Sequence, residues 1–123
     1  MPSGRRSDDE IYRVANGKGT RVSKRGQLAY IREVLRSYPE IKRKPAPNRT
    51  DNEAARLRAV EDMMDELGRM PDGAQRQRFV RMLYFEGRYT FWGVIDKVPI
   101  SQRTARRWNA RVMDIMANKM HLI

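Results

Sequence analysis

The final third of the chain, from Thr90 to His121, contains the pattern that constrains the fold most strongly. Its sequence is TFWGVIDKVPISQRTARRWNARVMDIMANKMH. A short apolar stretch leads to Pro99, which has no backbone N–H to donate and suits a tight turn. Ser101 is a favourable helix N-cap, and apolar side chains recur at helical spacing after it. The segment therefore predicts a short helix, a tight turn and a second, longer helix.

The apolar positions of this segment fall in register for packing between the two helices. They are Val94, Val98, Ile100, Ala105 and Trp108, and the apolar side continues along the second helix with Val112, Ile115, Met116 and Met120. Ser101 is expected to begin that helix by accepting a hydrogen bond from a backbone amide near Thr104. This arrangement is typical of a helix-turn-helix.

The outward positions of the second helix are basic or polar. Its first two turns carry Gln102, Arg103, Arg106 and Arg107, with Arg111 one turn further on. A guanidinium can form paired hydrogen bonds with guanine, and an amide can do so with adenine. A helix also fits the major groove of duplex DNA. The pattern therefore predicts a double-stranded DNA partner, with Arg111 better placed for the backbone than for bases.

The charge of the chain agrees with a polyanionic partner. The chain has 123 residues, a formal net charge of +11 and a pI near 10.7. Such a bias favours nucleic acid or an anionic membrane surface. No apolar run approaches the ~20 residues of a spanning helix, and the N-terminus lacks the apolar stretch of a signal peptide. We therefore expect no membrane partner.

The residue types present also argue against an enzyme. There is no cysteine, which excludes disulfides and thiolate metal sites, and His121 is the only histidine. A histidine-based triad or a zinc site within one chain is therefore untenable. We predict no catalytic residue, no metal and no cofactor, and the lack of cysteine suits a reducing cytoplasm.

The first half of the chain predicts a basic arm, a helix and a linker. Residues 1–22 lack apolar periodicity and are expected to be a flexible basic arm, which either contacts DNA or is a solvated tail. Residues 23–41 contain a helix over Ser23–Tyr38, which we expect Pro39 to end. Residues 42–52 read as a linker. Its cations, Lys42, Arg43 and Lys44, are more simply explained as solvated than as DNA contacts.

Residues 53–123 predict a helical domain. Its first helix, Glu53–Arg69, is expected to be capped by Thr50, Asp51 or Asn52. This helix has Leu57, Val60, Met64 and Leu67 at a/d-like spacing, with acidic residues on its other faces. Packing against the chain's own core is the favoured use of that seam. A dimer seam or an acidic surface for a partner protein is the alternative.

The next helix is expected to follow the break at Met70–Gly73 and to run to about Glu86. Asp72 and Gln75 have the spacing of a capping box. The apolar stripe of this helix is Phe79, Met82, Leu83 and Phe85. Gly87 is expected to end it, and Thr90 to cap the next helix. With no comparable strand signal, the predicted fold is all-α: a small helical domain with a C-terminal helix-turn-helix at residues 90–120.

Two blocks of the chain resemble the phage late transcription regulators of the RinA/ArpU type. The first is LAYIREVLRSYP, from Leu28 to Pro39. The second combines an aromatic helix end with an I-S-x-R-T-A-x-R pattern, carried by Phe79, Tyr84, Phe85, Ile100, Ser101, Arg103, Thr104, Ala105 and Arg107. The resemblance covers about half of the chain. It implies an activator of phage late genes in the cytoplasm of a bacterial host.

Without gaps, Thr90 to Val112 also resembles the fourth region of bacterial sigma factors. By that analogy Gln102, Arg103 and Arg107 face bases, whereas Ser101 and Arg106 face phosphates. Arg103 stands where the sigma pattern has an acidic residue, so we expect a preference for guanine there. To the backbone contacts we add Arg111 and, before the helix pair, Thr90 and Arg88.

Several partners and functions remain open at this point. A regulator would bind near a promoter, with host RNA polymerase and a second copy of the chain as candidate protein partners. The main alternative is a small terminase-type packaging protein, which would form a ring. A recombinase fragment lacks the nucleophile or carboxylate site that it needs. RNA binding would need exposed aromatic side chains, and Trp92 is the candidate that the core does not clearly claim.

Overall fold

The computed structural model describes residues 24–122, and in that range the chain is helical without strands. The predicted all-α fold is therefore confirmed, and the predicted arm at residues 1–22 lies outside the described residues. The elements are α2 (Lys24–Arg43), the 3₁₀ turn η1 (Ala46–Asn48), α3 (Asp51–Gly68), α4 (Gly73–Val80), the π-helical turn η2 (Arg81–Phe85), α5 (Phe91–Lys97) and α6 (Gln102–Lys119).

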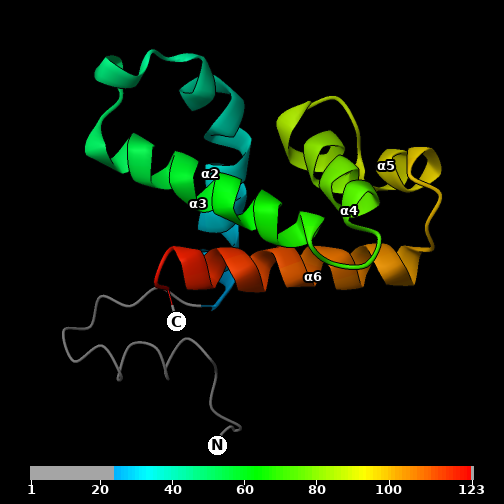
Figure 1. Cartoon of the computed structure of the whole chain (residues 1–123). Coiled ribbons are helices and arrows are strands. Elements are labelled where there is room, and N and C mark those ends of the chain that lie inside the picture. Colours follow the sequence, from blue (N-terminus) through cyan, green and yellow to red (C-terminus); the bar gives the residue numbers. More distant parts are fainter. Residues whose placement is uncertain (1–23, 123) are drawn as a thin grey trace, which may run out of the picture.

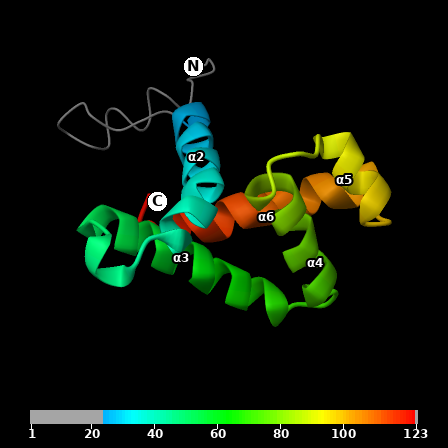
Figure 2. The same ribbon diagram turned by 90° about the horizontal axis from the view of Figure 1, so that it is seen from above.

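Helix α6 lies along one side of the molecule, and the other elements pack over it (Figures 1 and 2). Helices α2 and α3 contact its C-terminal half, whereas α4, η2 and α5 stand over its N-terminal half. One cluster of buried side chains draws on all of these helices, with Val34 of α2, Val60 of α3, Phe79 of α4 and Met116 of α6 fully buried in it. Helix α2, predicted to lie outside the 53–123 domain, thus packs into the same hydrophobic core as that domain.

Pro39 lies inside α2, so the prediction that it ends the helix is wrong. Proline removes one helical hydrogen bond, but tertiary contacts hold the following turn in place. Ile41 is buried in that turn. The Arg49 side chain returns to donate to the carbonyl oxygens of Ile41, at 3.1 Å, and Lys42, at 3.2 Å. These bonds satisfy carbonyls that the end of a helix leaves open.

The linker predicted at residues 42–52 is also shorter than expected, because Lys42 and Arg43 are helical and α3 begins at Asp51. Thr50 caps α3 in a reciprocal capping box with Glu53. The Lys44 ammonium lies 2.6 Å from a carboxylate oxygen of Glu53. Lys44 is therefore paired with α3, an ion pair that neither reading of the linker cations predicted.

Acidic side chains of α3 pair with cations of neighbouring helices. Glu61 lies 2.7 Å from the Lys42 ammonium and accepts a hydrogen bond from the Tyr38 hydroxyl at 3.1 Å. Burial and this bond raise the pKa of Tyr38 to about 12. Further along α3, Glu66 lies 3.3 Å from the Lys119 ammonium of α6. Glu53, Glu61 and Glu66 of α3 thus pair within the fold, whereas Asp62 and Asp65 are exposed. Leu57, Val60 and Leu67 pack into the core as predicted, but Met63 is buried there and the predicted Met64 is only half-buried.

The start of α4 differs from the prediction of a capping box. Asp72 precedes the helix with φ 60° and its side chain makes no capping hydrogen bond. An N-cap side chain reaches the amides of the first turn from an extended backbone, and the left-handed conformation of Asp72 does not give that approach. Gly87 has φ +73°, the conformation expected of a glycine that ends a helix.

The π-helical turn η2 changes which aromatic side chain enters the core. The Glu86 amide donates to the Arg81 carbonyl five residues earlier, at 2.9 Å. This wider turn rotates the following side chains relative to an α-helix. Tyr84 is consequently buried, whereas Leu83 and Phe85, predicted as core residues, are only half-buried. Phe79 and Met82 are buried as predicted.

We expect Gly73→Ala to lower the free energy of unfolding by about 1–3 kcal/mol, as overpacking does. A Cβ at Gly73 would lie 2.5 Å from the carbonyl oxygen of Gly68, a backbone atom that cannot move independently. Gly68→Ala is the matched control, because its Cβ meets the end of the flexible Gln77 side chain. Urea denaturation measures both. Equal stability of Gly73→Ala and the wild type would contradict the close approach of α3 and α4.

Candidate nucleic-acid interface

Helices α5 and α6 are joined by a four-residue connection, Val98–Ser101, and each begins with a side-chain cap. The Thr90 hydroxyl accepts a hydrogen bond from the Gly93 amide at 3.0 Å. The Ser101 hydroxyl accepts one from the Thr104 amide, also at 3.0 Å. Both predicted caps are confirmed. They fix where the two helices start, and so fix which side chains of α6 point outward.

The predicted inward face is buried. Val94, Val98 and Ala105 have no exposed surface and Trp108 is 4% exposed, whereas Ile100 is half-buried. The indole meets Phe79 edge-on at 6.0 Å between centroids, and the Arg76 guanidinium lies 5.0 Å from its centroid. Further along α6, Val112, Ile115 and Met116 are buried and Met120 half-buried. One side of α6 is therefore fixed against the core over its whole length.

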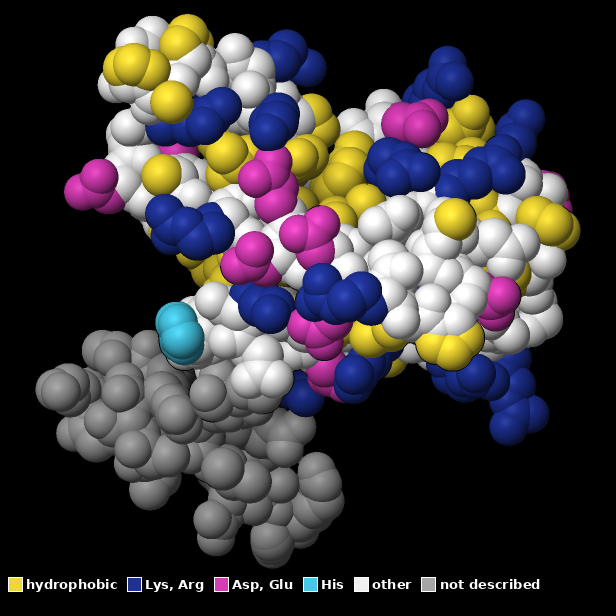
Figure 3. All heavy atoms as spheres, viewed as in Figure 1, with side chains coloured by type: hydrophobic (Ala, Val, Ile, Leu, Met, Phe, Trp, Pro, Cys, Tyr) yellow, Lys and Arg dark blue, Asp and Glu magenta, His cyan; other side chains and the backbone are white. Residues whose placement is uncertain are grey.

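The opposite side of α6 carries a row of three exposed arginines, Arg103, Arg107 and Arg111, which we call the arginine row. They are spaced by four residues and so lie along one face of the helix. None of them pairs with a carboxylate in residues 24–122. In Figure 3, basic side chains project from the lower edge of the molecule, where α6 lies in Figure 1. Like charges at this spacing repel one another, so an anionic partner would stabilise the row.

Other predicted site residues lie beside the arginine row rather than within it. The exposed Arg106 holds its guanidinium 5.8 Å from the centroid of the Phe91 ring, at the start of α5. Arg88 lies 5.2 Å from the centroid of the Tyr89 ring and 3.8 Å from a carboxylate oxygen of Glu86. Arg106 and Arg88 therefore flank the beginning of α5.

Gln102, Ser101 and Thr90 are exposed at the starts of the two helices. The Ser101 hydroxyl also donates to the Thr104 hydroxyl at 3.0 Å. Both cap hydroxyls are thus used locally, and their contribution to the site is to position the helices. Gln102 lies in the first turn of α6, directly before the arginine row.

Sequence reasoning missed that α2 adds cations to this side of the molecule. Lys24 and Arg32 of α2 line a cavity of about 440 Å³ together with Arg106, Phe91 and Met113. Beneath it, the Tyr84 hydroxyl donates to the Asn109 side-chain oxygen at 2.6 Å, and burial raises the pKa of Tyr84. The basic character of α2 is visible in its sequence, but its position beside α6 is a tertiary feature.

Comparisons with protein families, curated proteins and solved structures find no match to this chain. Within the described range, no group of three or more histidine or acidic residues is placed to hold a metal ion. The same range contains no helix that is long and apolar enough to cross a membrane. The assignment of a nucleic-acid interface therefore depends on the residues and geometry of this chain alone.

Proposed function

We propose that this chain is a sequence-specific binding protein for duplex DNA, and that the N-terminal half of α6 reads the major groove. The arginine row carries the proposal: three guanidiniums, without ion pairs among residues 24–122, share one exposed face of a helix whose other face is buried. The segment Gln102–Arg111 is about 15 Å long at 1.5 Å per residue. The major groove is about 12 Å wide and admits a helix of this kind.

The proposal gives the residues different roles. Gln102, Arg103 and Arg107 occupy the first two turns of α6 and contact base edges. Arg106, Arg88 and Arg111 contact phosphates. Ser101 and Thr90 are also predicted to face the DNA backbone. Their main contribution to DNA binding is to fix where the two helices start.

The one acidic side chain of α6 marks where the DNA contact ends. Asp114 is exposed and follows Arg107 by seven residues, which places both on the same face of the helix. A carboxylate near the phosphates would be repelled. The contact therefore stops before Asp114, and Arg111 lies at its edge.

The regulatory role rests on the resemblance to phage late regulators. Under this proposal the protein binds near a promoter and activates late genes, with host RNA polymerase as a partner. A DNA-packaging protein would instead assemble into a ring. Light scattering of the purified chain separates these two functions, because a ring has many times the mass of a monomer or dimer.

Fluorescence anisotropy tests the proposal that the nucleic acid is duplex DNA. We expect a labelled 20-bp duplex to bind more tightly than single-stranded DNA or double-stranded RNA of the same length. The deep, narrow major groove of RNA does not admit side chains as that of DNA does. Tighter binding of single strands would contradict groove reading and would point to stacking on the exposed Trp92.

Arg111→Ala should weaken binding to all duplexes by a similar factor. Losing one phosphate contact lowers the slope of log K against log salt by about 0.9. Arg43→Ala is the matched control, since Arg43 is exposed at the far end of α2. Titrations from 50 to 300 mM salt, a range in which phosphate contacts are measurable, give both slopes. An unchanged slope for Arg111→Ala would remove Arg111 from the interface.

A further inference from the structure

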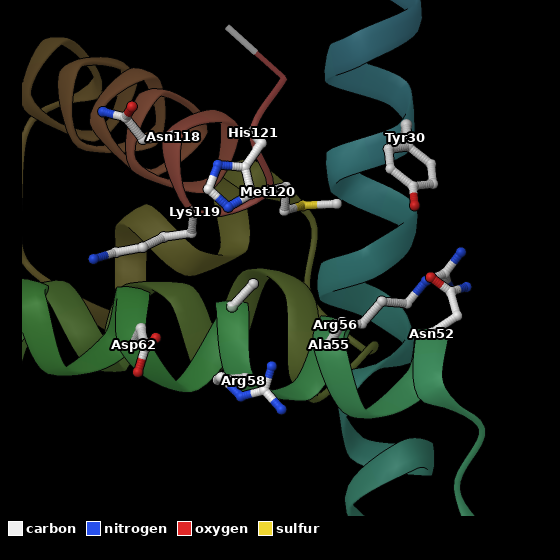
Figure 4. Close-up of a pocket in the computed structure, with 11 residues that line it drawn as sticks. Tyr30, Asn52, Ala55, Arg56, Arg58, Asp62, Asn118, Lys119, Met120 and His121 are labelled. Carbon is white, nitrogen blue, oxygen red and sulfur yellow. The ribbon is translucent and has the colours of Figure 1, made fainter.

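A second candidate site lies at the other end of α6. A cavity of about 590 Å³ opens between α2, α3 and the C-terminal end of α6. In Figure 4, Tyr30 and Arg56 form one wall, whereas Met120 and His121 extend from α6 on the opposite side. Cavities of 300–1,000 Å³ are typical of sites for small organic molecules. This one lies outside the interface proposed for DNA.

Arg56 is a partly buried cation in the lining of this cavity. Its Nε atom is buried and has no hydrogen-bond partner in the described part of the chain. The guanidinium lies 5.5 Å from the centroid of the Tyr30 ring, so its position is fixed by the ring face. A buried donor without a partner destabilises the fold. Because Nε itself is buried, the terminal N–H groups of the guanidinium are the donors of Arg56 that remain for an acceptor atom in the cavity.

The charges around the cavity favour an anion as the acceptor. Arg56, Arg58 and Lys119 line it, against a single carboxylate, that of Asp62. Lys119 also lies 3.3 Å from Glu66, so Arg56 and Arg58 are the lining cations that the ion pairs of the described helices leave for a ligand, and Arg56 is the less exposed of the two. The amide side chains of Asn52 and Asn118 are further donors in the lining. A guanidinium with neighbouring amides suits the oxygens of a phosphate or carboxylate.

Apart from His121, the remaining lining is apolar, which favours a ligand with an organic ring. Tyr30, Ala55, Ala59 and Met120 contribute ring and aliphatic surface. A bare inorganic ion would leave most of this surface uncovered. A planar ring attached to the anionic group would cover it and gain the free energy of apolar burial.

We propose that this cavity binds a small organic oxyanion, with the anionic oxygens at Arg56 and a planar body against Tyr30 and Met120. The phosphate of a mononucleotide and the carboxylate of an aromatic acid share this chemistry. The site is independent of the proposed DNA contact. Lys119 follows Arg103 by 16 residues on α6, which is about 24 Å along the helix.

Calorimetric titration of the full chain tests the proposal with three probes: AMP, benzoate and inorganic phosphate. We expect saturable binding to one site, at least ten-fold tighter for AMP or for benzoate than for phosphate. Tighter binding of AMP would assign a phosphate ligand, and tighter binding of benzoate a carboxylate. Equal affinity for all three probes, or no saturation by any of them at 10 mM, would overturn the proposal.

Variants of Arg56 separate a specific site from general attraction to a basic protein. Arg56→Met should weaken the preferred probe at least ten-fold, and Arg56→Lys, which keeps the charge but loses the planar guanidinium, should weaken it too. Arg78→Met is the matched control, because Arg78 is exposed on α4 and does not line the cavity. Equal weakening in Arg56→Met and Arg78→Met would overturn the proposal.

An NMR readout on the wild type does not depend on the folding of a variant. The buried Nε–H of Arg56 should give an exchange-protected signal that shifts on titration with the preferred probe. The Nε–H signals of the exposed arginines should shift less. A titration in which the Arg56 signal does not move while calorimetry saturates would place the ligand elsewhere and would contradict the site.

Discussion

Arg103→Ala and Arg107→Ala should each remove about 1–3 kcal/mol of discrimination at one base pair of the preferred DNA site. Both side chains are exposed on the same face of α6, in the turns that enter the groove, and neither has an ion-pair partner among the described residues. Because they face away from the core, neither change should alter the fold. The loss should therefore appear in binding to the preferred duplex and much less in binding to random duplexes.

Competition binding at near-physiological salt measures this difference. The preferred duplex is compared with a set in which each base pair is changed in turn. Each variant should lose its preference at one position, with guanine as the expected base opposite Arg103. Arg111→Ala is the internal control and should lose affinity without losing preference. Equal losses on preferred and random duplexes for all three variants would refute the division between base and backbone contacts.

Trp108→Ala should lower the free energy of unfolding by about 3–5 kcal/mol, as the loss of a buried tryptophan does. The side chain projects from α6, is 4% exposed, and packs against Phe79 of α4 and beneath the Arg76 guanidinium. Its removal leaves a cavity next to the turns of α6 that carry the arginine row. We expect the melting temperature to fall by more than about 10 °C.

Trp92→Ala is the matched control, because Trp92 is 57% exposed on α5. Surface substitutions usually change stability by less than about 0.5 kcal/mol, so this variant should melt near the wild type. Circular dichroism follows both unfolding transitions. A near-normal melting temperature for Trp108→Ala would place Trp108 at the surface, and would change the register that directs the arginines outward.

The features that the sequence predicted correctly depend on local chemistry. Thr90 and Ser101 cap helices as expected, and Thr50 does so as one of the three candidates for its helix, because each hydroxyl needs only the amide three residues later. Gly87 ends a helix because it adopts a positive φ. The burial of one side of α6 follows from its helical period. These features do not require knowledge of what packs nearby.

The wrong predictions concern places where tertiary packing overrides a local rule. Pro39 continues a helix because Ile41 is buried and Arg49 caps the following carbonyls. Tyr84 replaces Leu83 and Phe85 in the core because a π-helical turn changes the helical period. Neither the helical turn after Pro39 nor the π-helical turn can be predicted from the spacing of residues in the sequence.

Of the candidate sites, one is predictable from local sequence and the others depend on tertiary packing. The arginine row follows from the spacing of Arg103, Arg107 and Arg111, together with the buried face opposite to them. The approach of Lys24 and Arg32 to Arg106 depends on how α2 crosses α6, and local patterns do not encode it. The cavity at Arg56 likewise combines residues from three helices that are distant in sequence.

Selection from a pool of random duplexes, with the wild-type chain at near-physiological salt, tests sequence-specific reading by α6 most directly. The account predicts that one short motif is enriched, that it contains guanine, and that Arg103→Ala/Arg107→Ala does not enrich it. A palindromic motif would add dimerisation. If the wild type enriches no motif, the arginine row serves general attraction to nucleic acid, and the proposal of a sequence-specific regulator is contradicted.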